Sequence, residues 1–583
     1  MLHTLTRSLR ENKGLALVTV LLSALEVVFE IVIPLFMSNL IDFGIEGGSM
    51  AAVWKFGAFL LLLAAFQLST GVLAARIAAR ASVGFAANLR EDMYNNVQTF
   101  AFSNIDKFST ASIVTRLTTD TTNVQNAFQM LMRMAIRAPV MLIFSMIVSF
   151  RISRDISMTF LIILPILALA LFFIIRSVFP VFSRVFRTYD ELNNVVQENI
   201  RGIRVVKSFN QERHEIGKFG AISERIYKDF SKGERLITLN APLMQFCIYT
   251  CMIVISWLGA KAIIASGNDP ALGLTTGNLT ALITYTMQIL SSLMMLSMVF
   301  AMLTISLSSA RRIAEVLEEQ SDIPQPEQPV MTVRDGAVDF DHVSFVYASK
   351  ADKKVLDDID LHIRSGETIG IIGGTGASKS SLVQLIPRLY DVTGGKLTLG
   401  GVDVRDYDLD TLRGAVAMVL QKNELFSGTI AENLRWGNEN ATDEQLRHAC
   451  KLACADDFIS AMPDGYDTHI EQGGTNVSGG QKQRLCIARA LLKKPKVLIL
   501  DDSTSAVDTR TDAQIQQALS TYIPDTTKII IAQRISSVQN ADRIVVLDDG
   551  HINAVGCHDE LLRTCEIYRE VYESQQKGGE DDA

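Results

Sequence analysis

A serine-glycine loop and an acidic strand end lie close together in the second half of the chain. The loop is Val477–Gln481, with the sequence Val-Ser-Gly-Gly-Gln. The apolar stretch Val497–Leu500 follows and leads directly into Asp501 and Asp502. A glycine-rich loop that contains Lys379 precedes both by about 100 residues. This order predicts a site for ATP, with Asp501 placed to hold Mg²⁺ through water.

The glycine-rich loop follows a short apolar strand, Thr368–Ile372, and precedes an apolar helix predicted to run to Tyr390. Strand, loop, Lys-Ser and helix cradle phosphates, because backbone N–H groups and the helix N-terminus point at them. Lys379 would reach the terminal phosphates, and the hydroxyl of Ser380 would bind Mg²⁺. The loop residues expected to contact the nucleotide are Gly373, Thr375, Gly376, Ala377, Ser378, Lys379, Ser380 and Ser381.

Two residues depart from what rapid hydrolysis requires. Asp502 stands where a glutamate would activate water, and its reach is shorter by about 1.5 Å. Ser378 occupies a loop position where glycine lets the backbone approach phosphates without a Cβ in the way. We expect ATP to bind with altered geometry, the alternative being a loop that no longer holds nucleotide.

The chain is long enough for two or more domains and changes character near its middle. It has 583 residues, of which 48% are apolar and only 20% are charged. Long apolar runs fill roughly the first 310 residues, and the remainder has the composition of a soluble α/β domain. The formal net charge of −8 argues against a nucleic-acid partner. The seven cysteines lack framework spacing and are expected to be buried thiols in a reducing compartment.

Six stretches are apolar and long enough to span a lipid bilayer, which requires about 20 residues. They are Leu15–Ile41, Val53–Ala79, Met130–Phe150, Ile156–Phe179, Leu239–Ile264 and Leu279–Leu307. The connections Arg80–Arg133 and Arg176–Arg235 are rich in Lys and Arg. The positive-inside rule therefore places these connections, both termini and the second half of the chain in the cytoplasm. The turn that carries Arg151 and Arg154 is an exception to this rule, because it should lie outside the cell although it contains two arginines. The negative charge of Asp155 compensates for only one of them.

The two long connections lack the apolar periodicity of an independent core, so we predict helices that continue beyond the bilayer. Each turns in a short polar segment, Ile105–Ser112 in the first and Ser208–Ile216 in the second. These turns are the natural contacts with a cytoplasmic domain.

Two carboxylates of the first span, Glu26 and Glu30, lie one turn apart and share a helix face. Carboxylates at membrane depth usually face a bundle interior or water. Two interpretations stay open at this point. The pair lines a cavity that attracts cationic cargo, or it lies near the membrane surface or forms a structural pair with Arg137.

The order, spacing and flanks of these motifs resemble an ATP-binding cassette (ABC) exporter half-transporter of the type IV fold, over nearly the whole chain. The resemblance implies a multidomain membrane protein. Residues 1–320 would form an all-α transmembrane domain with six helices, and 321–330 a linker that contains three prolines. Residues 331–576 would form an α/β P-loop nucleotide-binding domain with a helical subdomain, and 577–583 an acidic tail.

The resemblance also gives each motif a role. Tyr347 stacks on adenine, and the Walker A loop is Gly373–Ser381. The D-loop is Ser503–Asp508, and Gln533 stands in the position of the switch histidine. The Mg²⁺ ligands are Ser380, Asp501 and the Q-loop glutamine Gln421. The intact signature residues are Ser478, Gly479, Gly480 and Gln481.

In this family the signature of one chain completes the ATP site of the other. Gln533 can bond the γ-phosphate but carries no positive charge, and Asp502 is short. Both losses fall on transition-state stabilisation rather than on ATP binding. The resemblance therefore implies that the Walker site of this chain hydrolyses ATP slowly. It also implies a heterodimer with a second half-transporter that retains the catalytic glutamate and the switch histidine.

The resulting prediction is a multidrug-type translocase, multi-pass in a bacterial plasma membrane, that exports hydrophobic or amphipathic compounds with ATP and Mg²⁺. Two alternatives stay open. The chain is chiefly a regulatory ATP-binding half with little turnover, or it is a homodimeric peptide or lipid exporter in which Asp502 and Gln533 are tolerated.

Overall fold

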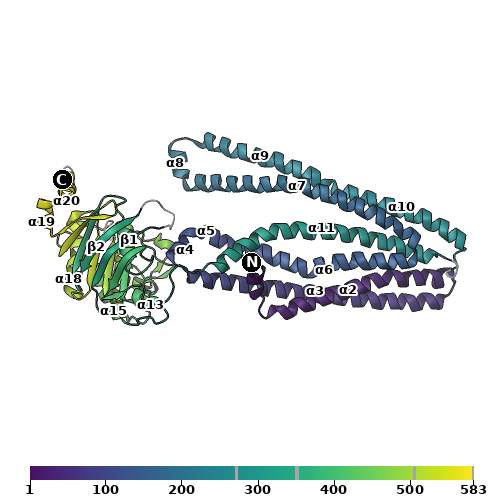
Figure 1. Ribbon diagram of the computed structural model, residues 1–583, viewed down its shortest axis with the longest axis horizontal. Helices are drawn as coiled ribbons and strands as arrows, with labels where there is room; N and C mark the ends of the chain where they lie inside the picture. Colours follow the sequence, from purple (N-terminus) through teal and green to yellow (C-terminus); the bar gives the residue numbers. More distant parts are fainter. Residues whose placement is uncertain (270–272, 348–353, 503–506, 581–583) are drawn as a thin grey trace. The chain divides into compact units, whose positions relative to one another are not determined.

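The computed structural model (Figure 1) describes residues 1–583 except 270–272, 348–353, 503–506 and 581–583. The chain forms two compact units. A helical unit comprises Met1–Gln98 and Thr110–Glu319, and an α/β unit comprises Thr99–Ser109 and Gln320–Ala583. The short segment Thr99–Ser109 thus belongs with residues more than 200 positions later in the sequence.

Six helical segments in the described part of the helical unit are long and apolar enough to cross a membrane. They are Asn12–Glu46, Met50–Gln98, Thr110–Ile152, Arg154–Arg201, Glu212–Ser266 and Thr276–Glu318. Each contains one of the predicted spans, so the prediction of a multi-pass, all-α membrane domain is confirmed.

The individual helices of this unit are labelled in chain order. They are α1 (Leu2–Arg7), α2 (Asn12–Asn39), the π-helix η1 (Leu40–Glu46), α3 (Met50–Gln98), α5 (Thr110–Thr115), the π-helix η2 (Arg116–Asp120), α6 (Thr121–Ile152), α7 (Arg154–Arg201), α8 (Ile203–Ser208), α9 (Glu212–Thr238), α10 (Asn240–Ser266) and α11 (Thr276–Glu318). Between α3 and α5, helix α4 (Phe102–Lys107) belongs to the α/β unit.

Several helices continue well beyond the thickness of a bilayer. Helix α3 has 49 residues and α7 has 48. At 1.5 Å per residue each is about 70 Å long, against a hydrocarbon core of about 30 Å. The long polar connections are therefore helical extensions of the spans, as predicted.

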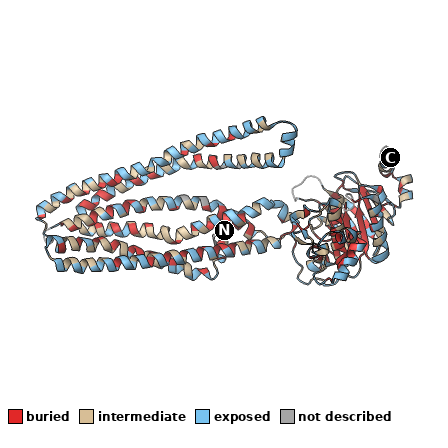
Figure 2. Ribbon diagram, turned by 180° about the vertical axis from the view of Figure 1, so that it is seen from behind, coloured by how far each residue is buried: buried red, intermediate tan, exposed pale blue. Residues whose placement is uncertain are grey.

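The most extensive helix contacts join α6 with α11, α2 with α3, and α7 with α9, and both α2 and α3 also pack against α6. Alanines at 74, 78 and 81 form a buried stripe on α3, where small side chains let helix backbones approach closely. Figure 2 shows the buried residues concentrated on the facing sides of the helices, with exposed residues on their outer sides.

Arg137 of α6 joins the two acidic residues of the first span. Its Nη1 donates to Glu26 Oε1 and its Nη2 to Glu30 Oε2, both at 2.7 Å. Gln288 of α11 donates to the main-chain carbonyl of Glu30 and accepts from Ser145 of α6. Of the two interpretations above, the structure shows the structural pair, extended to a three-residue ion bridge between α2 and α6.

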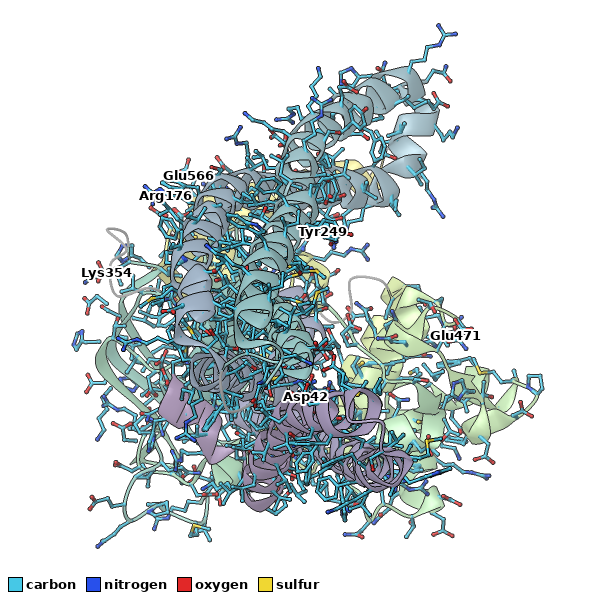
Figure 3. All side chains as sticks on the ribbon, turned by 90° about the vertical axis from the view of Figure 1, so that its right-hand side faces the viewer. Asp42, Arg176, Tyr249, Lys354, Glu471 and Glu566 are labelled. Carbon is cyan, nitrogen blue, oxygen red and sulfur yellow. The ribbon has the colours of Figure 1, made fainter. Side chains whose placement is uncertain are left out.

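Asp42, in η1, fixes the start of α11 (Figure 3). Its Oδ1 accepts the backbone N–H of Gly277 at 2.8 Å, and its Oδ2 accepts the hydroxyl of Thr275 at 2.7 Å. A Cβ at residue 277 would collide with the carbonyl oxygen of Ser38. Glycine is therefore required here, because the two backbones meet.

The α/β unit contains a six-stranded sheet in the order β12-β11-β3-β10-β9-β6 and a four-stranded antiparallel sheet in the order β2-β1-β4-β5. A two-stranded sheet, β7-β8, completes it among the described residues. The strands are β1 (Val338–Phe345), β2 (Leu356–Ile363), β3 (Thr368–Gly373), β4 (Gly394–Leu399), β5 (Val402–Asp403), β6 (Val416–Val419), β7 (Gly428–Thr429), β8 (His469–Ile470), β9 (Val497–Asp501), β10 (Thr527–Ile531), β11 (Arg543–Asp548) and β12 (His551–Gly556).

Helices connect these strands and form a helical subdomain near α15 and α17. They are α12 (Lys379–Gln384), α13 (Leu409–Ala415), α14 (Ile430–Arg435), α15 (Asp443–Leu452), α16 (Asp456–Ser460), α17 (Gly479–Leu492), α18 (Thr509–Tyr522), α19 (His558–Thr564) and α20 (Glu566–Glu580), with the short 3₁₀ turns η3 (Gly465–Asp467), η4 (Gln472–Gly474) and η5 (Ile535–Ser537). The predicted class, six membrane helices followed by an α/β domain, is confirmed.

The central strands are buried along their whole length and mostly apolar, because both faces of the sheet are covered. Every residue of β9 and β10 is buried. β10 lies parallel to β9 on one side and to β3 on the other, with Ile531 level with Asp501 and Ile371. The carboxyl ends of these three strands therefore meet at one edge of the sheet, where ligands bind in open α/β folds.

Candidate nucleotide-binding site

The glycine-rich loop connects β3 to α12 at this edge. Lys379 starts α12, and its ammonium folds back to donate to the carbonyls of Gly373 and Gly374, each at 2.8 Å. Burial lowers the pKa of Lys379, while Asp501 and Asp502 act in the opposite direction. Phosphate oxygens can replace the two carbonyls as acceptors, which makes this lysine a ready partner for a polyphosphate.

Helix α12 is shorter than the sequence predicts. It ends at Gln384 rather than at Tyr390. Pro387 lacks a backbone N–H and disfavours helical backbone at the residue before it, so the helix cannot continue. Arg388 then adopts a positive φ of 51°, which turns the chain toward Tyr390.

Ser378 adopts the left-handed conformation, with φ 65° and ψ 22°. A residue with a Cβ pays about 1–2 kcal/mol in this region, whereas glycine does not. The sequence analysis expected glycine at this position, and the structure gives a local reason. The backbone is left-handed here, which favours glycine, but the residue is a serine.

Replacing Ser378 with glycine should raise the free energy of unfolding by about 1 kcal/mol, because the strain of the left-handed serine disappears. Thermal denaturation of the full-length chain measures the effect. Ala377→Gly is the matched control, since Ala377 is buried, packs against Gly373 and has no positive φ. It should destabilise, and a loss of stability in Ser378→Gly as well would show that no strain is stored there.

The end of β9 carries two buried carboxylates, Asp501 and Asp502. Burial raises the pKa of Asp501, and the neighbouring Asp502 raises it further, while Ser380 and Lys379 lower it. A divalent cation would stabilise the ionised form of this carboxylate. Ser380, Gln421 and Asp501 offer the hydroxyl, amide and carboxylate oxygens that suit Mg²⁺.

Asp502 is held by two amide side chains. Its Oδ2 accepts Gln533 Nε2 at 2.7 Å and Gln421 Nε2 at 3.3 Å. Residue 502 has a positive φ of 48°, which aspartate tolerates better than most residues. The structure thus brings together three residues that the sequence separates by up to 112 positions, and it gives the carboxylate two neutral donors.

The serine-glycine loop lies at the start of α17. The hydroxyl of Ser478 accepts the N–H of Gln481 at 3.3 Å, and Gln481 Oε1 accepts the N–H of Ser478 at 2.9 Å. This reciprocal capping box forms the N-terminus of α17, where Ser478 and Gly479 are exposed. Within the described residues, no hydrogen bond joins these two side chains to the glycine-rich loop. The predicted D-loop falls largely on residues 503–506, which lie outside the described residues.

Comparisons with known proteins agree with this geometry. Residues 16–309 match the family described as ABC transporter transmembrane region, and residues 356–505 match the family described as ABC transporter. The chain is 35% identical to an ABC transporter ATP-binding protein of Bacillus subtilis, YfiB, over 96% of each chain. It is 33% identical to an ABC transporter ATP-binding protein of Mycobacterium tuberculosis, Rv1273c, over 99% of this chain and 98% of that one.

The chain belongs to the ABC transporter family. A solved structure, described as a bacterial Atm1-family ABC exporter with ATP bound, superposes with a TM-score of 0.80, covering 97% of this chain and 98% of that one at 24% identity. The membrane domain and nucleotide-binding domain of this ABC transporter therefore have the fold of an exporter half.

Tyr347, which the sequence analysis expects to stack on adenine, is half-exposed and contacts helix α12. Its hydroxyl lies 2.8 Å from Ser381 Oγ, and its ring meets the ring of Tyr390 edge-on, with centroids 5.1 Å apart. The sequence analysis missed these contacts of Tyr390 and gave only its place after the glycine-rich loop. An aromatic residue that follows a helix-ending proline is the signal that could have pointed to them.

Tyr390 also holds helix α4. Its hydroxyl donates to Asp106 Oδ2 at 2.8 Å, and its ring lies edge-on to Phe102 at 6.0 Å. Asn104 of α4 donates to the carbonyl of Gln320 at 2.9 Å. The first polar turn therefore contacts the α/β unit through Phe102–Lys107, slightly earlier than the predicted segment Ile105–Ser112. The second turn exposes Phe209 and Ile216.

Removing the hydroxyl in Tyr390→Phe should lower the hydrogen-exchange protection of the α4 amides about tenfold, because one charge-assisted hydrogen bond is lost while the ring contacts stay. Hydrogen exchange followed by mass spectrometry measures this. Tyr347→Phe is the matched control, since its hydroxyl contacts Ser381 and not α4. Equal protection in both variants would show that the Tyr390 hydroxyl does not anchor α4.

Proposed function

We propose that this ABC transporter is one half of a heterodimeric exporter, and that its own Walker site holds ATP but cleaves it slowly. The observation that carries the proposal is the 2.7 Å contact in which the amide of Gln533 donates to Asp502. The two residues nearest the attacking water would thus be a short carboxylate and a neutral amide.

Binding and cleavage make different demands on this site. Lys379, the loop N–H groups and the ligands for Mg²⁺ act on bound ATP, and all are supported by the geometry. Cleavage requires a carboxylate within about 2.6–3.2 Å of the attacking water and charge stabilisation at the γ-phosphate. Asp502, already engaged by Gln421 and Gln533, reaches less far than glutamate, and neither amide supplies positive charge.

When bound, Mg²⁺ neutralises charge that develops on the phosphates. Side chains of this chain would bind and orient the metal ion and the nucleotide. Ser380 and Asp501 would bind Mg²⁺, Gln421 would link the metal site to Asp502, and Tyr347 would cover the adenine ring. The exposed N-terminus of α17 is suited to bind the ATP of a second chain.

The heterodimer follows from the contrast between the two motifs. The capping box at Ser478 and Gln481 is intact and exposed, whereas the Walker side carries Ser378, Asp502 and Gln533. In a homodimer, both ATP sites would combine an intact signature with a Walker side that lacks the glutamate and the histidine. A partner half-transporter that has both residues would form one catalytically competent site together with the signature of this chain.

Export of hydrophobic or amphipathic compounds is supported by the exporter fold and by the six spans. Both termini and the α/β unit would lie in the cytoplasm of a bacterial cell. ATP binding would move the membrane helices through α4 and the α8–α9 turn, which can shift the conformational equilibrium only through differential affinity for its two states.

Purification from the native host tests this proposal. We expect a second half-transporter to co-purify, ATP to bind this chain, and most phosphate release to depend on the partner's Walker site. Rapid hydrolysis by this chain alone, as a homodimer, would contradict the proposal and favour a homodimeric peptide or lipid exporter.

A regulatory ATP-binding half is the second candidate, favoured by the fully formed phosphate loop beside a weak catalytic pair. Lys379→Ala in the purified pair separates the two. Lost transport with preserved hydrolysis at the partner's site indicates a regulatory half whose occupied site is an obligate switch. Hydrolysis that falls in step with transport indicates that both sites share the catalytic cycle.

A further inference from the structure

The main chain on both sides of Arg534 is held by a single side chain of the last helix, α20. Gln575 of α20 accepts the N–H of Ile535 on its Oε1 at 2.9 Å. Its Nε2 donates to the main-chain carbonyl of Gln533 at 2.8 Å. One amide therefore fixes the backbone directly after Gln533, and the proposed function gives this amide no role.

These two hydrogen bonds replace a missing strand neighbour. β10 ends at Ile531, and Ala532 still donates its N–H to the carbonyl of Ile371 in β3. Beyond that point, no other hydrogen bond between described residues holds the carbonyl of Gln533 or the N–H of Ile535. A residue on a parallel strand would bond to a carbonyl and to the N–H two positions later, which is the pattern that the Gln575 amide reproduces.

Helix α20 is itself anchored to the core of the α/β unit. Tyr568 is buried, and its hydroxyl lies 2.7 Å from Nδ1 of His558, the first residue of α19. Tyr572 packs against the apolar cluster that contains Ile535. Gln575 follows Tyr572 by three residues, less than one helical turn. The amide therefore projects from a packed element, which gives its partners a fixed position.

The contacts of Gln575 continue to the carboxylate at the end of β9. The side chain of Gln533, whose carbonyl Gln575 holds, donates to Asp502 Oδ2 at 2.7 Å. The other end of the same loop is held separately, because Ser537 donates to Asp512 of α18 at 2.6 Å. A glutamine side chain has several rotatable bonds, so the direction of its amide depends on where its backbone is held. Gln575 sets that point for Gln533.

We propose that Gln575 is a positioning residue of the nucleotide site, which fixes the backbone at Gln533 so that the Gln533 amide meets the γ-phosphate of ATP. The inference rests on the proposed function, in which this chain binds ATP and Gln533 takes the switch position. Gln575 acts through Gln533 and does not contact the nucleotide. An amide is required at position 575, because a carboxylate lacks the donor and an ammonium lacks the acceptor. The result is a preference for ATP over ADP, since ADP has no γ-phosphate.

Equilibrium binding of Mg·ATP and of Mg·ADP to the purified full-length chain tests the inference. Gln575→Ala should weaken ATP binding about tenfold and change ADP binding less than about twofold, because only the contact to the γ-phosphate is lost. Gln575→Glu should behave in the same way, since its carboxylate can accept the Ile535 N–H but repels the Gln533 carbonyl. Gln533→Ala should reproduce the loss, and combining it with Gln575→Ala should add nothing further, because both act through one contact.

The matched control is Gln576→Ala, which truncates the next glutamine of the same helix. Gln576 is exposed and does not hold the loop after β10, so this variant should keep the parent's affinities for both nucleotides. A Gln575→Ala variant that keeps the parent's preference for ATP would overturn the inference. ADP binding weakened as strongly as ATP binding would overturn it as well, because the loss would then be a general disturbance of the site. A parent chain that binds neither nucleotide would overturn the proposed function and, with it, this inference.

Discussion

The ATPase rate of the purified chain should rise about 100-fold when Asp502 is replaced by glutamate and Gln533 by histidine together. A correctly placed general base contributes about 10²–10⁴ to the rate, and glutamate restores the missing reach toward water. Histidine supplies a cation where Gln533 has only a neutral amide. On the proposed function, the intact capping box at Ser478 and Gln481 would let two repaired chains form complete sites without a different partner. Phosphate release at saturating Mg·ATP measures the effect.

The control for this variant replaces the carboxylate at position 502 by an uncharged amide of similar shape. Asp502→Asn with Gln533→His should stay as slow as the unmodified chain, since asparagine cannot accept a proton. A second control, Lys379→Ala in the repaired chain, should abolish turnover by removing a phosphate ligand. If the unmodified chain already hydrolyses ATP rapidly and Asp502→Asn stops it, the slow-site proposal is wrong.

Replacing Arg137 with alanine should cause the largest loss of stability in the helical unit, about 3–5 kcal/mol. Arg137 is the single bridge between Glu26 and Glu30 among the described contacts, and its loss leaves two carboxylates close together without a cation. Glu26 is buried against α3, where a Cβ on Gly71 would lie 3.2 Å from its Oε1. The melting temperature of the full-length chain in detergent measures the effect.

The matched variant removes all three charges at once, as Glu26→Gln, Glu30→Gln and Arg137→Met. It should recover most of the lost stability, because replacing a buried ion group by neutral side chains of similar volume is often close to neutral. Arg137→Lys should fall between the two, since an ammonium lacks the planar fork that reaches both carboxylates. An Arg137→Ala variant as stable as the parent would show that the ion bridge does not contribute to the stability of the helical unit.

The elements that form the candidate nucleotide site could be predicted because each is encoded locally. The glycine-rich loop has its glycines and lysine in one short run, and β9 is apolar along its length before Asp501. The break in α12 at Gln384 was missed although Pro387 stands in the sequence, because the apolar pattern continues through Leu389 and outweighs one proline in a periodicity argument. The left-handed φ of Ser378 was also not visible, since nothing local to a serine specifies it.

Most pairings between distant residues could not be predicted; the pair of Glu26 and Glu30 with Arg137 was one of two interpretations that the sequence left open. The partner of Tyr390 is Asp106, 284 positions earlier. The contact between Gln533 and Asp502 depends on the register that sets Ile531 level with Asp501 across two parallel strands. The sequence offers several acceptors for each donor, and only strand and helix packing selects one.

By itself the sequence determined six spans, a glycine-rich loop between a strand and a helix, an acidic strand end and an intact serine-glycine motif, because hydrophobic periodicity and turn chemistry act over a few residues. Tertiary structure decided between the two interpretations of Glu26 and Glu30, and it alone decided that α4 joins the α/β unit and that Asp502 is held by two amides. These arrangements follow from how helices pack and how strands align, which brings together groups that the chain keeps far apart.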